Sequence, residues 1–243
     1  MLTEQDIRNI KWELSDFICS MENMDFYGDF FSAGEDVDDF LNERKDTLPF
    51  AYDYSFGCTK LVIIPEDENY VIKIPFNSGY SYDEEDYIFF SHADCPDKMD
   101  YCSVEASYYS YAQQYGFERF FMPTYLINGG FGCKYPIYVQ EKVEVYNDLE
   151  WSGDIEKYIP SAESMKAVKE LNSDGRPFSY LRAGGKWKAS LYENFIDDDE
   201  REEFFQFMED FSFIFEDLHN NNIGYKDGLP VIFDYSGYNE ADF

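Results

Sequence analysis

Residues 215–238 read FEDLHNNNIGYKDGLPVIFDYSGY, and this segment near the end of the chain says more about the fold than any other. Asp217 is followed five residues later by Asn222, and a turn and an apolar strand then lead to Asp234. A hairpin after a helix would bring Asn222 and Asp234 to the same end, with Asp217 at its rim. Oxygen atoms gathered in this way can hold Mg²⁺ beside a phosphate. They can also belong to ordinary turns, which Asn and Asp favour.

Upstream, residues 50–76 predict three antiparallel strands. Three short runs are rich in β-branched and aromatic residues and are separated by glycine or acidic turn residues. The runs are AYDYSFG (51–57), KLVIIPED (60–67) and YVIKIPF (70–76). Lys73 lies in the third run, where a charged side chain is out of place unless it serves a function.

A helix is predicted over residues 101–116. Aromatic and apolar side chains recur there at spacings of three and four and form one helix face, made of Tyr101, Val104, Tyr108, Tyr111 and Tyr115. Gly116 is expected to end the helix. Two further strands are predicted in the segments 120–129 and 134–146, joined by the turn GGFG.

The two ends of the chain are predicted to be mainly helical, over residues 3–45 and 145–219. Thr3 with Asp6 is a plausible helix start. The acidic run from Asp197 suits the start of the last helix, whose buried stripe is expected to contain Phe204, Phe207, Met208, Phe211 and Phe215. The polar segment 77–100 predicts an inserted loop with little regular structure.

The spacing of Asp217, His219 and Asn222 resembles the D-x-H-x-x-N catalytic loop of the protein-kinase-like fold. It is closest to the small-molecule branch of that fold, the aminoglycoside and choline kinase-like phosphotransferases, in which His replaces the usual Lys. The resemblance implies that Asp217 is catalytic. It also implies that Asn222 and Asp234 are the metal ligands, with ATP and Mg²⁺ as cofactors.

The first half of the chain supports the same resemblance. Lys73 matches the third-strand lysine that holds the α- and β-phosphates, and Glu105 matches the helix glutamate that pairs with it; a solvated helix charge is the alternative for Glu105. The loop between the first two strands and the strand before the hinge supply the other nucleotide-binding positions. These are Gly57, Cys58 and Thr59 for the phosphates, and Val139, Glu141 and Val143 for the base.

The resemblance covers about residues 50–238 and implies an α+β, bilobal fold. We expect a five-stranded antiparallel N-lobe sheet with one helix, and a small, mostly helical C-lobe. The expected boundaries are an N-terminal helical extension over residues 1–48, the N-lobe over 49–143 and a reduced C-lobe over 144–243.

Several positions depart from the family pattern. The phosphate loop has one glycine, Gly57, and Phe215–Glu216 replaces the usual His-Arg pair. The segment after Asp234 reads YSGY instead of Phe-Gly. We expect neither an activation loop nor a peptide-docking platform, so an acceptor would be held by residues 77–100, the N-terminal helices or residues 145–200.

The amino-acid composition limits the classes of molecule that this protein is expected to bind. The 243 residues contain 50 acidic and 19 basic side chains, which gives a net charge of −31. This charge argues against direct binding of nucleic-acid phosphates and against an anionic membrane surface. The opening residues lack a continuous apolar core, so we expect neither a signal peptide nor a membrane span.

The five cysteines are odd in number and scattered, which favours reduced thiols and a cytoplasmic location. His92, Cys95 and Cys102 fall close together in the sequence. A structural zinc site needs four well-placed ligands, and no CxxC pair is present, so a zinc site here is the weaker alternative.

Two functions stay open at this point. The first is an ATP- and Mg²⁺-dependent phosphotransferase that acts on a small-molecule or unusual acceptor. The second is a catalytically inactive kinase-fold binding protein, either a pseudokinase or an acidic interaction module whose surface mimics nucleic acid. In the first case nucleotide is the partner, and in the second an unknown protein is.

Overall fold

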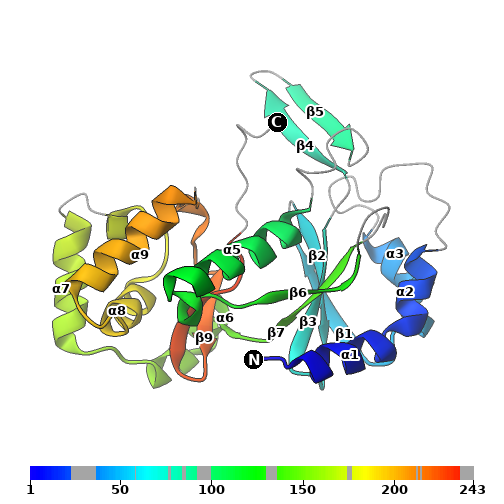
Figure 1. Cartoon of the computed structure of the whole chain (residues 1–243), viewed down its shortest axis with the longest axis horizontal. Helices are drawn as coiled ribbons and strands as arrows, with labels where there is room; N and C mark the ends of the chain where they lie inside the picture. Colours follow the sequence, from blue (N-terminus) through cyan, green and yellow to red (C-terminus); the bar gives the residue numbers. More distant parts are fainter. Residues whose placement is uncertain are drawn as a thin grey trace. The chain divides into compact units, whose positions relative to one another are not determined.

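The computed structural model describes residues 1–22, 37–57, 59–75, 78–83, 86–91, 100–129, 136–173, 177–211, 213 and 215–235. The chain divides into two compact units (Figure 1). Unit 1 contains Met1–Ala106, Pro123–Lys142 and Asn239–Phe243, and unit 2 contains Ser107–Met122 and Val143–Tyr238. No helix among the described residues is long and apolar enough to cross a membrane.

Unit 1 is built on a five-stranded antiparallel sheet, as predicted. Its strands are β1 (Tyr52–Phe56), β2 (Lys60–Pro65), β3 (Tyr70–Pro75), β6 (Thr124–Asn128) and β7 (Ile137–Glu141), in the spatial order β1-β2-β3-β7-β6. Helix α5 (Tyr101–Tyr115) stands in the sequence between β3 and β6. The predicted pattern of three strands, a helix and two strands is therefore confirmed, and the chain is an α+β protein.

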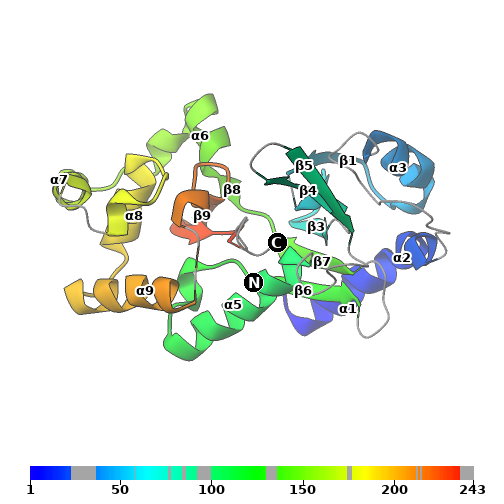
Figure 2. The ribbon, with the colours of Figure 1, turned by 90° about the horizontal axis from the view of Figure 1, so that it is seen from above.

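The N-terminal helices cover one face of this sheet (Figures 1 and 2). They are α1 (Glu4–Glu13), α2 (Ser15–Glu22) and α3 (Val37–Arg44), followed by the 3-10 turn η1 (Lys45–Thr47). The predicted start of α1 is confirmed: the Thr3 hydroxyl accepts a hydrogen bond from the backbone N–H of Asp6, and the Asp6 carboxylate accepts one from that of Thr3. Leu14 and Phe17 are fully buried with Ile72 of β3 in one apolar core.

Part of the predicted loop over residues 77–100 is instead a β-hairpin. Strands β4 (Ser78–Asp83) and β5 (Asp86–Ser91) pair antiparallel, with Ser78 opposite Ser91 and Asp83 opposite Asp86. The segment YIFF in β5 and the tyrosines of β4 have high β-propensity, which outweighed the polar composition on which the loop was predicted. Residues 92–99 lie outside the described part of the chain, and with them His92 and Cys95 of the zinc alternative.

Helix α5 begins and ends where the sequence predicts, and Gly116 after it has a positive φ of 82°. Its most buried face is shifted by one residue from the predicted one: the buried positions after Tyr101 are Cys102, Glu105, Tyr109 and Ala112. The predicted tyrosines lie at the edge of that face. Tyr108 and Tyr111 each stack on a phenylalanine of unit 2 at centroid distances of 4.5 and 4.4 Å.

Unit 2 is mostly helical and contains a small antiparallel sheet. Its helices are α6 (Tyr146–Ser152), α7 (Ala162–Ser173), α8 (Gly185–Glu193) and α9 (Asp198–Asp210), with 3-10 turns at η2 (Glu118–Phe120), η3 (Asp154–Lys157), η4 (Pro177–Ser179) and η5 (Phe215–Asp217). The strands are β8 (Glu144–Val145), β9 (Ile223–Lys226) and β10 (Leu229–Ile232), in the order β10-β9-β8. Helices α7 and α8 lie side by side (Figure 2).

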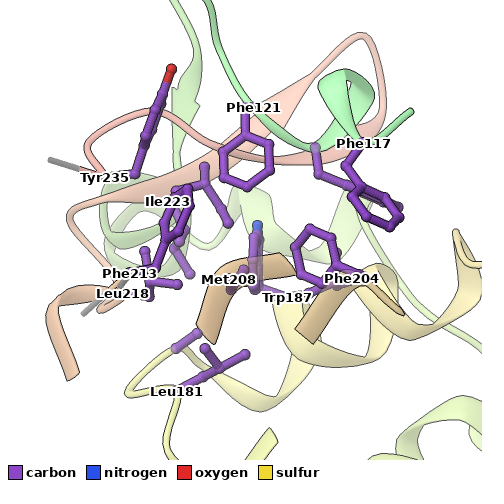
Figure 3. Close-up of a cluster of buried hydrophobic side chains, with 14 of the residues drawn as sticks. Phe117, Phe121, Leu181, Trp187, Phe204, Met208, Phe213, Leu218, Ile223 and Tyr235 are labelled. Carbon is purple, nitrogen blue, oxygen red and sulfur yellow. The ribbon is translucent and has the colours of Figure 1, made fainter. Parts of the chain in front are cut away.

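The core of unit 2 is largely aromatic (Figure 3). Phe204 of α9 is fully buried, and its ring meets that of Phe117 edge to face at 5.4 Å. Trp187 of α8 is also fully buried, and its indole N–H donates a 2.9 Å hydrogen bond to the carbonyl of Gly224 in β9. The stripe predicted for the last helix is confirmed for Phe204, Phe207 and Met208; α9 ends at Asp210, so Phe211 and Phe215 lie beyond the helix, and both are only partly buried. Large rings thus supply the volume that aliphatic residues fill in other cores.

Candidate functional site

The predicted lysine and glutamate meet inside unit 1. The ammonium group of Lys73 in β3 lies 2.8 Å from Oε2 of Glu105 in α5. Glu105 is fully buried, and the Lys73 side chain is 3% exposed. Glu105 is therefore not a solvated helix charge. An ion pair this deep is costly to desolvate, which makes it a candidate for function rather than a source of stability.

A second lysine, which the sequence interpretation missed, contacts the same carboxylate. Lys60 at the start of β2 donates to Oε1 of Glu105 at 2.6 Å. The strand register could have revealed it. Val62 is paired with Lys73, and Lys60 stands two residues before Val62, so the two lysines occupy diagonal positions on the same sheet face.

Neighbouring side chains hold Glu105 in place. The hydroxyl of Thr124 in β6 donates to Oε2 of Glu105 at 2.7 Å, and the side-chain amide of Gln140 in β7 donates to that hydroxyl at 2.9 Å. Cys102 lies one helical turn before Glu105 and is fully buried, and burial raises the pKa of its thiol well above the usual value. The carboxylate thus accepts three hydrogen bonds from fixed donors.

The loop between β1 and β2 is only partly available to a phosphate. The N–H of Gly57 donates a 3.2 Å hydrogen bond to the carbonyl of Lys60, which closes the turn. Gly57 is exposed, and no heavy atom lies within 4 Å of where its Cβ would stand. Thr59 is half-buried. Cys58 lies outside the described residues.

The predicted base-binding residues lie on strand β7 and just after it: Val139 is expected to bind through its side chain, and Glu141 and Val143 through their backbone. Val139 is paired with Ile72, so its side chain lies on the opposite sheet face and is buried in the core with the N-terminal helices. Glu141, at the end of β7, is 7% exposed and paired with Tyr70. Val143 follows in unit 2 and is half-buried. On the Lys73 side, β7 presents Tyr138 and Gln140 instead.

In unit 2 the residues predicted to form a catalytic loop are brought together. The side-chain amide of Asn222 donates a 2.8 Å hydrogen bond to the backbone carbonyl of Asp217, which also accepts one from the N–H of His219 at 2.9 Å. The Asp217 side chain is 31% exposed, and its Oδ1 lies 3.9 Å from Nε2 of His219. Asn222 is 9% exposed. The Asp217 carboxylate is thus partly exposed, on a loop whose backbone is held by hydrogen bonds from Asn222 and His219.

Asp234 is tied to the same loop through the backbone. The carbonyl of Asn222 accepts hydrogen bonds from the N–H groups of Phe233 at 3.1 Å and Asp234 at 3.3 Å. Asp234 is half-buried and lies two residues after the end of β10. The hairpin therefore places Asp217, Asn222 and Asp234 at one end, as the sequence predicts.

Other contacts of unit 2 fix the position of this loop. The side-chain carbonyl of Asn220 accepts a hydrogen bond from the N–H of Gly184 at 2.8 Å, and its backbone carbonyl accepts one from Asn147 at 3.1 Å. Beyond Asp234, the Tyr235 hydroxyl donates to the carbonyl of Met122 at 2.9 Å. The loop is anchored from several sides, which suits a site that needs fixed geometry.

The side-chain oxygens of the predicted ligands in unit 2 fit Mg²⁺ better than a metal ion that needs three or more protein ligands. Within the described part of the chain, no group of three or more His, Cys, Asp and Glu side chains could hold a metal ion. Asn222 and Asp234 together offer an amide oxygen and a carboxylate. Mg²⁺ in nucleotide sites takes one or two such ligands and completes its shell with water and phosphate oxygens, so the two residues fit that ion.

No family model, no curated protein and no solved structure matches this chain. The resemblance to the protein-kinase-like fold therefore depends on the residues and geometry described above.

Proposed function

We propose that the chain is an ATP- and Mg²⁺-dependent phosphotransferase of the protein-kinase-like fold, acting on a small-molecule or unusual acceptor. The buried ion pair between Lys73 and Glu105 is the observation that carries the proposal. A lysine is buried at large desolvation cost on a sheet face, and its partner glutamate fixes its ammonium group. Such a lysine is suited to holding the α- and β-phosphates of ATP.

Unit 2 would supply the remaining chemistry. Asn222 and Asp234 would hold Mg²⁺, which neutralises charge on the β- and γ-phosphates. The partly exposed carboxylate of Asp217 would orient the acceptor hydroxyl and accept its proton as the oxygen attacks the γ-phosphorus. ADP then leaves with the bridging oxygen, and the acceptor carries the phosphoryl group.

The first test is thermal unfolding with ATP and Mg²⁺ together and with each alone. A ligand that binds only the folded protein stabilises it by about 2.7 kcal/mol at a hundredfold excess over its Kd. We expect a Mg²⁺-dependent rise in Tm that is lost in Lys73→Ala and Asp234→Ala. Asp227→Asn is the control, because this residue lies in the β9–β10 turn with φ 51°, where Asn is tolerated. No rise in the unmodified protein would overturn nucleotide binding.

The second candidate is a kinase-fold binding protein without turnover, either a pseudokinase or an acidic interaction module. Two observations favour it. The Gly57 N–H already donates to the carbonyl of Lys60, so it is not available to a phosphate, and the protein has a net charge of −31. Asp217→Asn separates the two candidates. For an enzyme, this variant keeps the Mg²⁺-dependent rise in Tm and loses release or transfer of the γ-phosphate. For a binding protein, the unmodified chain shows no turnover to lose, whether it binds ATP as a pseudokinase or binds none as an acidic interaction module.

A further inference from the structure

His219 lies beside the proposed catalytic carboxylate, and the proposed reaction gives it no role. Nε2 of its ring is 3.9 Å from Oδ1 of Asp217. The His219 side chain is 40% exposed and that of Asp217 is 31% exposed, so solvent reaches both groups. A small molecule that approaches the Asp217 carboxylate therefore also meets the imidazole of His219.

The loop backbone decides which ring nitrogen of His219 carries the proton. The N–H of Asn221 donates a 3.3 Å hydrogen bond to Nδ1. A backbone N–H only donates, so Nδ1 carries no proton and the ring proton is on Nε2. The backbone of His219 is held as well, because its N–H donates to the carbonyl of Asp217 and its carbonyl accepts from the N–H of Asn222, each at 2.9 Å. His219 thus keeps a hydrogen-bond donor at Nε2, beside a carboxylate.

The distance between the two side chains fits one oxygen atom between them. At 3.9 Å, Nε2 and Oδ1 are too far apart for a direct hydrogen bond, and within the described part of the chain Nε2 makes no other. An oxygen about 2.8 Å from each atom would accept from Nε2–H and donate to Oδ1. A carboxylate accepts several hydrogen bonds, so Asp217 can take this one beside those that it already makes. A hydroxyl group is both acceptor and donor, and it matches the pair.

We propose that His219 is a second acceptor-binding residue, whose Nε2–H donates to the hydroxyl oxygen that attacks ATP. This inference rests on the proposed phosphotransferase function. One lone pair of the hydroxyl oxygen accepts the hydrogen bond from His219, and the other forms the new bond to the γ-phosphorus. The bond from that phosphorus to the bridging oxygen breaks, ADP leaves with its electron pair, and the hydroxyl proton passes to Asp217. His219 thereby fixes the direction of attack.

Two substitutions in the full-length protein separate the two ring nitrogens. His219→Asn keeps an oxygen that accepts from the N–H two residues on, as Asn does in Asx turns, but its amide ends short of the position of Nε2. His219→Gln does the reverse: its longer side chain brings a neutral N–H donor near the position of Nε2, and the N–H of Asn221 loses Nδ1. The control is Asn221→Ala at the exposed neighbouring position, which keeps the backbone N–H.

The measurement is the steady-state rate of γ-phosphate transfer from ATP with Mg²⁺, using water and glycerol as the probe acceptors. We expect His219→Asn to lower kcat about 10- to 100-fold, the effect of losing one hydrogen bond in the transition state, with the KM for ATP and the Tm unchanged. His219→Gln should recover most of this loss, which a role for positive charge on the ring would not allow. Asn221→Ala should match the unmodified protein.

The outcomes separate this inference from the proposed function. If the unmodified protein transfers no γ-phosphate, the proposed function fails and the inference fails with it. If it turns over ATP and His219→Asn has the same kcat, the function stands and His219 belongs only to the structure of the loop. Equal losses in His219→Asn and His219→Gln would also overturn the inference, as would a raised KM for ATP or a lowered Tm in His219→Asn, because a missing donor at Nε2 explains none of them.

Discussion

The side-chain amide of Asn222 donates a 2.8 Å hydrogen bond to the backbone carbonyl of Asp217. The bond spans the loop between the 3-10 turn η5 and strand β9, and it joins a proposed metal ligand to the backbone of the residue that carries the proposed catalytic carboxylate. Asn222 thus has a structural role that exists without any metal. The two roles can be separated by variants that keep the oxygen and change the amide.

Asn222→Asp is expected to destabilise the protein by about 1–3 kcal/mol, because the part-buried backbone carbonyl of Asp217 loses its side-chain donor, keeps only the N–H of His219, and faces a carboxylate. Urea unfolding at pH 7 measures this loss. Asn221→Asp adds the same charge at the neighbouring exposed position and is expected to change the unfolding free energy little. Equal losses in the two variants would show that added charge, not the hydrogen bond, is responsible.

Glu105→Gln is expected to cost about 3–5 kcal/mol, because it leaves two buried ammonium groups without their shared carboxylate. Glu156→Gln removes a surface ion pair with Lys186 and should cost no more than about 1 kcal/mol. The measurement is the free energy of unfolding in denaturant for both variants. A cost for Glu105→Gln as small as that of the control would contradict the ionised cluster.

Gly224→Ala is expected to destabilise unit 2 by about 1–3 kcal/mol. A Cβ at this position would lie 2.4 Å from the backbone carbonyl oxygen of Glu144, so β8 and β9 would have to separate. Gly185→Ala in α8 is the control: no heavy atom lies within 4 Å of its Cβ position, and alanine favours a helix. Thermal unfolding should lower Tm for the first variant and leave it equal or higher for the second.

The strands and the paired residues of the candidate site could be predicted because their signals are local. Lys73 is the charged residue within an otherwise apolar strand, and Asp217 and Asn222 lie five residues apart in the same loop, so each signal can be recognised in a short stretch of sequence. Lys60 could not be singled out in this way. It stands at the end of its strand, where a charge is ordinary, and its role depends on the register with β3.

Other features were wrong or missed for equally physical reasons. Helix α5 carries tyrosines on more than one face, so the period of its aromatic residues could not show that a glutamate occupies the buried face. The burial of strand β7 could be predicted, but its register with β3, which puts Val139 on the face opposite Lys73, could not; the base-binding role of Val139 stays a prediction. Strand β8 is two residues long, too short for any periodicity, and is defined only by its pairing with β9.

Glu144 gives unit 2 a pH-dependent contribution to stability. The hydrogen bond from Lys157, and then that from Tyr158, hold the pKa of its carboxyl below the usual value of 4.5. The folded state therefore binds the proton more weakly than the unfolded state does. The contribution is fully present above pH 4.5 and is lost as the pH falls through the lowered pKa.

Glu144→Gln should therefore lower the unfolding free energy by less than about 1 kcal/mol at pH 7, because the side chain is 47% exposed. The gap between the two proteins should close as the pH is lowered below 4.5. Denaturant unfolding at matched pH values measures it, and the comparison cancels the titration of the many other acids. A gap that stays constant into the acid range would show that the carboxylate charge does not contribute.

Two cysteines of unit 1 should react with thiol reagents at very different rates. Cys19 is exposed, whereas Cys102 is fully buried and its pKa is raised by burial. At neutral pH we expect Cys19 to be alkylated directly and Cys102 only through opening of unit 1. Mass spectrometry of the peptides measures each site, and urea should equalise the rates. Rapid native labelling of Cys102 would contradict the packing of α5 on the sheet.

The burial of Trp187 makes tryptophan fluorescence a useful probe of unit 2. Of the three tryptophans, Trp12 and Trp151 are 82% and 88% exposed, whereas Trp187 is fully buried among the rings of unit 2. Its indole should emit at shorter wavelengths and resist acrylamide, while the other two are quenched. Replacing Trp12 and Trp151 by phenylalanine would leave a protein whose fluorescence reports unit 2 alone, so that melting of the aromatic core can be followed without a label.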